Sequence, residues 1–211
     1  MCSSDLKPFR HNEHSLRVVD VIEYEGRGLN LTWEVRDGIL NHTGETLPAT
    51  LEAQIVRVAD RVAYINHDID DAVRGGIIQE SDLPPGAVKF FGRHHGLRIS
   101  AMVKDMIAAS ADLSMIRMSE DGWCYLNELR DFLFDRVYTD SVAKTEDAKA
   151  ELVVRSLFDY FYTHPDQMTA EFRPAPGDNV AEKVVDYVAG MTDRFAIKTY
   201  QTLFIPKAWM V

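Results

Sequence analysis

Residues 59–72 read ADRVAYINHDIDDA and lie inside a longer stretch, residues 51–73, whose pattern decides the fold. Apolar residues recur along this stretch in steps of four and three, which is the spacing of one buried face of an α-helix. They are Leu51, Ile55, Val58, Val62, Ile65, Ile69 and Ala72. We therefore expect a long core helix over residues 51–73, closed by Gly75 and Gly76.

The same periodicity extends over most of the chain. It predicts further helices at residues 15–24, 32–40, 99–118, 123–137, 146–162 and 180–200, with a proline-containing loop at 81–86. The sequence contains no alternating strand pattern, no internal repeat and no low-complexity tract. An all-α fold follows.

Composition narrows the class of protein. The 211 residues are 46% hydrophobic and 27% charged, as in ordinary globular domains, and the net charge is −10. Such acidity argues against a protein that binds the nucleic-acid backbone. No membrane span or signal peptide is apparent in the sequence. Its two cysteines do not make a disulfide framework, so we expect the protein to be cytoplasmic.

Four polar residues of the long helix, Asp60, Tyr64, Asp68 and Asp71, share one face because they are spaced by four, four and three. A carboxylate between apolar rows is costly unless a cation meets it. For Asp60 that cation is Arg57 or Arg61 of the same helix, an arginine from another element, or a metal ion. The pattern is compatible with two interpretations of this helix face. It is either a partly solvated surface with a local ion pair or one wall of a functional site.

The segment LEAQIVRVADRVAYINHDIDDAVRGGII (51–78) resembles a signature of the deoxyguanosine triphosphate triphosphohydrolase-like proteins of the HD-domain superfamily. Three other segments agree with that family in order: FRHNEHSLRVVDVIE (9–23), LNLTWEVRDGILNHTG (29–44) and GMTDRFAIKTYQTLF (190–204). Together they cover essentially all of the chain after Leu6. The resemblance implies an HD-domain-like helical bundle.

The resemblance also implies an activity and a site. Family members hydrolyse a deoxynucleoside triphosphate to a deoxynucleoside and triphosphate, using a divalent metal ion such as Mg²⁺ or Mn²⁺. Matched residue by residue, Asp60 is a metal ligand, Arg61 lies near the phosphates, Tyr64 packs on the deoxyribose and Asp68 meets its 3′-hydroxyl. A homo-oligomer is expected as well.

This sequence departs from the family at its start. The family's remaining metal ligands, and the His and Glu that act as general acid and base, precede the segment that matches HNEHSLR (11–17). We therefore assign no catalytic residue and expect a bundle incomplete at the N-terminus: the C-terminal portion of such an enzyme, with negligible activity as it stands. Residues 1–6 match a translated sequencing adapter and are expected to be a non-native leader, followed by a single helical domain at 7–211. The alternative is a non-catalytic nucleotide-binding or oligomerisation module.

Other residues give weaker indications of a functional site. The pair His67-Asp68 imitates a metal-binding His-Asp doublet, but adjacent helical residues diverge by about 100°. His11 and His14 have the spacing of a ligand pair, but we favour a helix end left exposed by the missing N-terminal segment. A phosphate or regulatory nucleotide could bind the cluster of Arg93, His94, His95 and Arg98, but we favour a solvated start of a helix or a subunit contact. His42 is expected at a helix C-terminus, and Trp123 in the packing.

Overall fold

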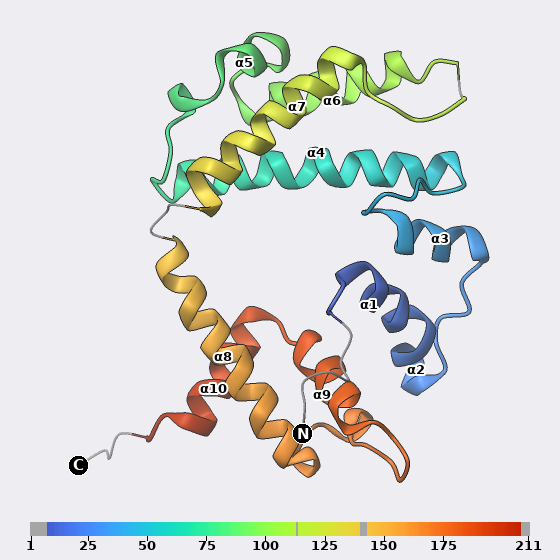
Figure 1. The fold of residues 1–211 in the computed structure, drawn as a ribbon, viewed down its shortest axis with the longest axis vertical. Helices are drawn as coiled ribbons and strands as arrows, with labels where there is room; N and C mark the ends of the chain where they lie inside the picture. The colour runs from blue at the N-terminus through green and yellow to red at the C-terminus, as the bar shows by residue number, and fades with distance from the viewer. Residues whose placement is uncertain (1–7, 113, 140–142, 208–211) are drawn as a thin grey trace. The chain divides into compact units, whose positions relative to one another are not determined.

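The computed structural model describes residues 8–112, 114–139 and 143–207 (Figure 1). Over these ranges the chain forms helices and connecting segments without any strand, which confirms the all-α fold expected from the periodicity. None of the described helices is both long and apolar enough to cross a membrane.

The chain divides into two compact units, one ending at residue 142 and the other covering residues 143–211. Each unit has its own hydrophobic cluster. The single domain expected over 7–211 stays a prediction, because two compact units can still fold as one cooperative body. The leader expected at residues 1–6 lies outside the described residues.

The first unit is built around one long helix, α4 (Leu51–Arg74), which has α6 and α7 on one side and α3 on the other (Figure 1). The N-terminal elements are α1 (His11–Arg17), the π-helical turn η1 (Val18–Ile22), α2 (Glu23–Gly26) and α3 (Trp33–Asn41). After α4 come η2 (Glu80–Asp82), α5 (Pro85–Phe91), α6 (His95–Ala109), α7 (Glu120–Leu133) and the π-helical turn η3 (Phe134–Tyr138).

The boundaries of α4 match its sequence signals to within one residue. The Thr50 hydroxyl accepts a hydrogen bond from the Ala53 amide at the N-terminus, and Gly75 ends the helix. Most of the predicted stripe is buried, with Leu51 half-buried. Ile55 is the exception, since 43% of it is exposed. The buried stripe turns the opposite side of α4, which carries Asp60, towards solvent.

The expected helix at 99–118 is shorter and displaced. Helix α6 begins at His95 and ends at Ala109, and residues 116–118 run back as a partly buried segment. The Ser110 hydroxyl exchanges hydrogen bonds with the backbone of Arg117, and the Ile116 amide donates to the buried Gln54 side chain at 3.0 Å. These side-chain bonds replace the helical ones that the apolar pattern predicted.

Two further expectations need correction. The proline-containing loop at 81–86 leads straight into α5, because Pro85 occupies the first helical turn, where a missing amide hydrogen costs nothing. The expected helix at 15–24 begins earlier, at His11, and its regular part ends with η1 at Ile22, since Tyr24 and Glu25 adopt left-handed conformations.

The second unit is a smaller helical assembly of α8 (Ala143–Thr163), η4 (Pro165–Gln167), η5 (Ala170–Phe172), α9 (Val180–Ala189) and α10 (Asp193–Phe204). Its buried residues are Leu157, Phe161, Met168, Val184 and Tyr187. The single helix expected at 180–200 was wrong, because α9 stops at Gly190 and Thr192 caps the start of α10 by accepting from the Phe195 amide.

Candidate active site

The solvent-facing side of α4 forms one wall of a cavity of about 700 Å³ in the first unit. Three residues singled out in the sequence, Asp60, Arg61 and Tyr64, line it together. Arg57 of the same helix also lines the cavity, and the charged, histidine and aromatic lining residues from other segments are His11, His42, Arg117, Glu120 and Trp123. A cavity of this volume with a few convergent polar groups is typical of a small-molecule site.

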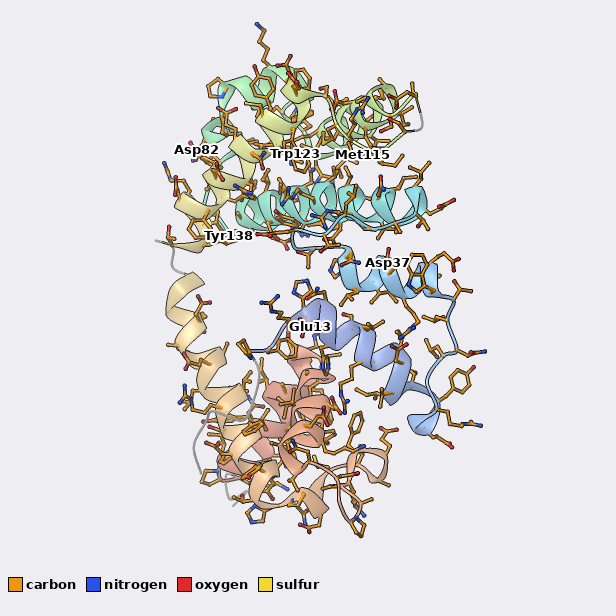
Figure 2. All side chains as sticks on the ribbon, turned by 45° about the vertical axis from the view of Figure 1, so that its right-hand side comes forward. Glu13, Asp37, Asp82, Met115, Trp123 and Tyr138 are labelled. Carbon is orange, nitrogen blue, oxygen red and sulfur yellow. The ribbon has the colours of Figure 1, made fainter. Side chains whose placement is uncertain are left out.

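Arg61 is positioned by an aromatic ring. Its guanidinium carbon lies 4.8 Å from the ring centroid of Trp123 on α7, which Figure 2 places beside α4. Such a cation–π contact fixes the plane of the guanidinium while leaving its donors free. Arg61 makes no ion pair with any of the described residues, so an anionic ligand can use those donors. Trp123 is 39% exposed, so the expectation that it serves only packing was wrong.

Arg57 has a structural task. It donates hydrogen bonds to the carbonyl oxygens of Asn41, Gly44 and Thr46, and so fastens the segment after α3 against α4. Among the described residues Arg57 makes these backbone hydrogen bonds and no ion pair with Asp60.

Asp60 is exposed at the cavity and forms no ion pair with any arginine in the described ranges. Among those residues no group of three or more His, Cys, Asp or Glu side chains is placed to hold a metal ion. Since a catalytic ion takes about three protein ligands, the residues described do not fit a complete metal centre. The role of Asp60 as a metal ligand stays a prediction.

Asp68 does not line the cavity with the other three. It accepts a hydrogen bond from the hydroxyl of Tyr138, which belongs to η3 and lies beside the C-terminal part of α4 (Figure 2). Partial burial, reinforced by the carboxylate of Asp68, raises the pKa of Tyr138. The phenol therefore remains a hydrogen-bond donor throughout the physiological pH range. The sequence analysis did not predict that Tyr138 contacts Asp68, because a helical pattern does not show which residue 70 positions away lies beside it.

The histidine and arginine cluster before α6 is engaged internally. Arg98 is buried and donates to the Asn66 side chain and to the Arg93 carbonyl, both at 2.6 Å. Burial lowers the pKa of Arg98, while Glu80 and Asp70 oppose that shift. His94 pairs with Glu80 at 3.2 Å. Because Arg98 is buried and bonded within the core, it is not available to bind a phosphate at the cluster of residues 93–98.

His67 is not among the residues that line the Asp60 cavity. Its ring is parallel to that of His95, with the centroids 5.8 Å apart. The interpretation of His67-Asp68 as an imitation of a His-Asp doublet stays a prediction.

His11 and His42 are the residues that sequence reasoning undervalued. Both line the cavity, and their Nε2 atoms lie 3.2 Å apart. His42 follows the last residue of α3, as predicted, but its second nitrogen meets a histidine 31 positions earlier. His14, the other member of the predicted His pair, is not among the lining residues.

Comparisons with known proteins show the family of the chain. A family model described as the phosphohydrolase-associated domain matches residues 116–202, which include Trp123 and Tyr138. A deoxyguanosinetriphosphate triphosphohydrolase-like protein of Cereibacter sphaeroides is 33% identical over 258 residues, covering 92% of this chain and 68% of the relative. The chain belongs to the deoxyguanosinetriphosphate triphosphohydrolase-like family.

Other members of the deoxyguanosinetriphosphate triphosphohydrolase-like family are more similar. The protein of that name from Caldanaerobacter subterraneus is 48% identical over 202 residues, covering 95% of this chain and 60% of the relative. The one from Clostridium tetani is 40% identical over 211 residues, covering 94% and 60%. The chain thus spans about three fifths of the length of these relatives. Family membership confirms the resemblance seen in the sequence.

Proposed function

We propose that this chain supplies the nucleotide-binding wall of a deoxynucleoside triphosphate triphosphohydrolase, which converts its substrate and water to a deoxynucleoside and triphosphate. One observation carries the proposal: Asp60, Arg61 and Tyr64 line a single cavity large enough for a nucleotide. The names of the relatives support the same class of substrate.

Each residue in the wall has a chemical task. Arg61, whose guanidinium lies over the ring of Trp123, presents planar donors that suit phosphate oxygens. Tyr64 offers a ring face to the deoxyribose. Asp68 lies outside the lining of this cavity, but its Oδ1 is not used by Tyr138 and is the atom that we expect to meet the sugar hydroxyl. The carboxylate can accept both bonds at once.

The metal requirement is part of the proposal. The exposed carboxylate of Asp60 suits a hard divalent cation such as Mg²⁺ or Mn²⁺. Because the residues described do not bring three ligands together, we derive no catalytic step through an ion. We expect the chain alone to bind substrate with negligible turnover.

Calorimetric titration with dGTP in the presence of Mg²⁺ tests the proposal. Arg61→Gln should weaken binding about 10-fold or more, since hydrogen bonds to charged groups contribute about 1.5–3 kcal/mol. Arg93→Gln, which removes an exposed arginine outside the cavity, should leave the affinity unchanged. Equal affinities of the wild type and Arg61→Gln would refute the assignment. Metal-dependent release of triphosphate by the chain would refute only the expected lack of turnover.

A further inference from the structure

The hydrogen positions of one histidine in the cavity wall follow from its neighbours. Nδ1 of His42 lies 2.7 Å from the carbonyl oxygen of Ile39. A carbonyl oxygen only accepts hydrogen bonds, so Nδ1 of His42 carries a hydrogen. In the neutral ring, Nε2 of His42 is then a bare acceptor.

The hydrogen positions of His11 follow from those of His42. The 3.2 Å separation between the two Nε2 atoms is a hydrogen-bond distance, and such a bond needs a single hydrogen between the nitrogens. With Nε2 of His42 bare, Nε2 of His11 donates. Nδ1 of His11 is then the bare nitrogen of the pair, and His11 is exposed where it lines the cavity.

We propose that His11 and His42 form a proton relay in the cavity wall, in which Nδ1 of His11 takes up the proton and His42 positions His11 and shares the charge. Nδ1 of His11 carries the added proton whichever of the two rings then bears the positive charge. If the hydrogen between the rings stays on His11, His11 is the cation. If it crosses to Nε2 of His42, His42 is the cation, and Nδ1 of His11 still carries the added proton.

The end of α3 fixes the place of His42 in the cavity wall. The carbonyl oxygens of its last three residues, 39–41, accept hydrogen bonds from His42 itself, from Asn12 and from Arg57. The charged residues Arg57, Asp60, Arg61, Arg117 and Glu120 line the same cavity as the two histidines. Glu34 and Glu52 line a second groove that His42 also borders.

The relay deepens the proposed function, and only its use in catalysis rests on that function. Hydrolysis of a phosphate ester releases a proton from the attacking water, and a bare imidazole nitrogen in the cavity wall can accept it. The proton would enter at Nδ1 of His11, and the positive charge would move one ring away towards α3. His42 would thus act on the reaction through His11 and not by touching substrate.

Nitrogen-15 NMR of the histidine rings in the nucleotide-free chain tests the relay, because protonated and bare ring nitrogens have distinct shifts. His11→Gln and His42→Gln spectra assign the signals. At a pH where both rings are neutral, we expect protonated Nδ1 and bare Nε2 for His42, and the reverse for His11. A wild-type His11 with bare Nε2, or with both tautomers mixed, would overturn the proposal.

Two variants separate positioning from packing. His42→Leu removes the acceptor and should leave His11 as a mixture of tautomers, whereas His42→Gln keeps an acceptor and should restore the single form. The docking of α1 on α3 survives both changes, because the Asn12 side chain donates to the Leu40 carbonyl at 2.7 Å. An unchanged His11 in His42→Leu would contradict the positioning role. The readout needs no nucleotide, so a failure of dGTP binding would overturn the proposed function and not the relay.

Discussion

Arg61 and Trp123 show what a local pattern can and cannot predict at the scale of single residues. Asp60 and Tyr64 are four residues apart on one helix, so their place on one face followed from residue spacing, whereas Arg61 entered through the family resemblance. Trp123 and His42 reach the same cavity from other helices. No periodicity within a segment encodes such long-range contacts, and for that reason the sequence indicated only the part of the site that lies on α4.

The cation–π contact yields the first prediction. Trp123→Leu should weaken dGTP binding about 2- to 5-fold, because an exposed contact of this kind contributes about 0.5–1 kcal/mol and here it aligns Arg61. Trp33→Leu removes a tryptophan that is 59% exposed on α3 and does not line the cavity. Isothermal titration of the two variants makes the comparison, and equal losses would show that Trp123 has no special part.

The hydrogen bond between Tyr138 and Asp68 yields the second prediction. Tyr138→Phe and Asp68→Asn should each lower the free energy of unfolding, and the double variant should lose about 1 kcal/mol less than their sum. Urea unfolding of the four proteins measures this coupling. Tyr24→Phe, at an exposed tyrosine, is the control. Strict additivity would mean that the bond contributes nothing to stability.

At the scale of elements, capping residues decided where prediction succeeded. Helix α4 was placed to within one residue because Thr50 and Gly75 mark its ends. The break between α9 and α10 was missed because the apolar pattern continues across Gly190, and one glycine is compatible with a helix interior. The left-handed turn after η1 has no such signal, since Tyr24 and Glu25 are unusual residues at positive φ.

The turn that joins η1 to α3 gives a matched pair of glycines. Gly26 and Gly28 both have positive φ, but an added Cβ at Gly28 would lie 2.3 Å from the carbonyl oxygen of Asp20. At Gly26 the nearest atom would be 3.8 Å away. Gly26→Ala should therefore cost about 1 kcal/mol of unfolding free energy, and Gly28→Ala clearly more. Thermal denaturation measures both, and an equal loss would show that the turn relaxes around the new methyl group.

An ion pair between η1 and α3 gives a pH-dependent prediction. Arg36 donates two hydrogen bonds of 2.8 Å to Asp20, and these hold the pKa of Asp20 below its ordinary value. The bond thus stabilises the fold at neutral pH, and its contribution is lost as the pH falls through that lowered pKa. Asp20→Asn should melt below the wild type at pH 7, and the gap should narrow below about pH 4. Glu13→Gln, at a looser 3.8 Å pair with Arg10, is the control. A gap that is constant with pH would contradict the ionic account.

At the scale of the whole molecule, every lining residue of the cavity belongs to the first unit, and the second unit has a core of its own. The sequence predicted one helical domain because its helical periodicity runs through both units without a change of composition. The net charge of −10 makes the chain as a whole repel phosphates. The proposed binding of a nucleoside triphosphate therefore depends on the arginine side chains that line this cavity.

The most direct measurement is hydroxyl-radical footprinting with and without dGTP and Mg²⁺, read by mass spectrometry at individual side chains. The account predicts protection of Tyr64 and Trp123, which line the cavity. It predicts no change at Trp33 on α3 or at Phe195 of the second unit, both of which are well exposed. Protection of Phe195 or of the segment around Arg98, with Trp123 unchanged, would place the nucleotide elsewhere and contradict the account.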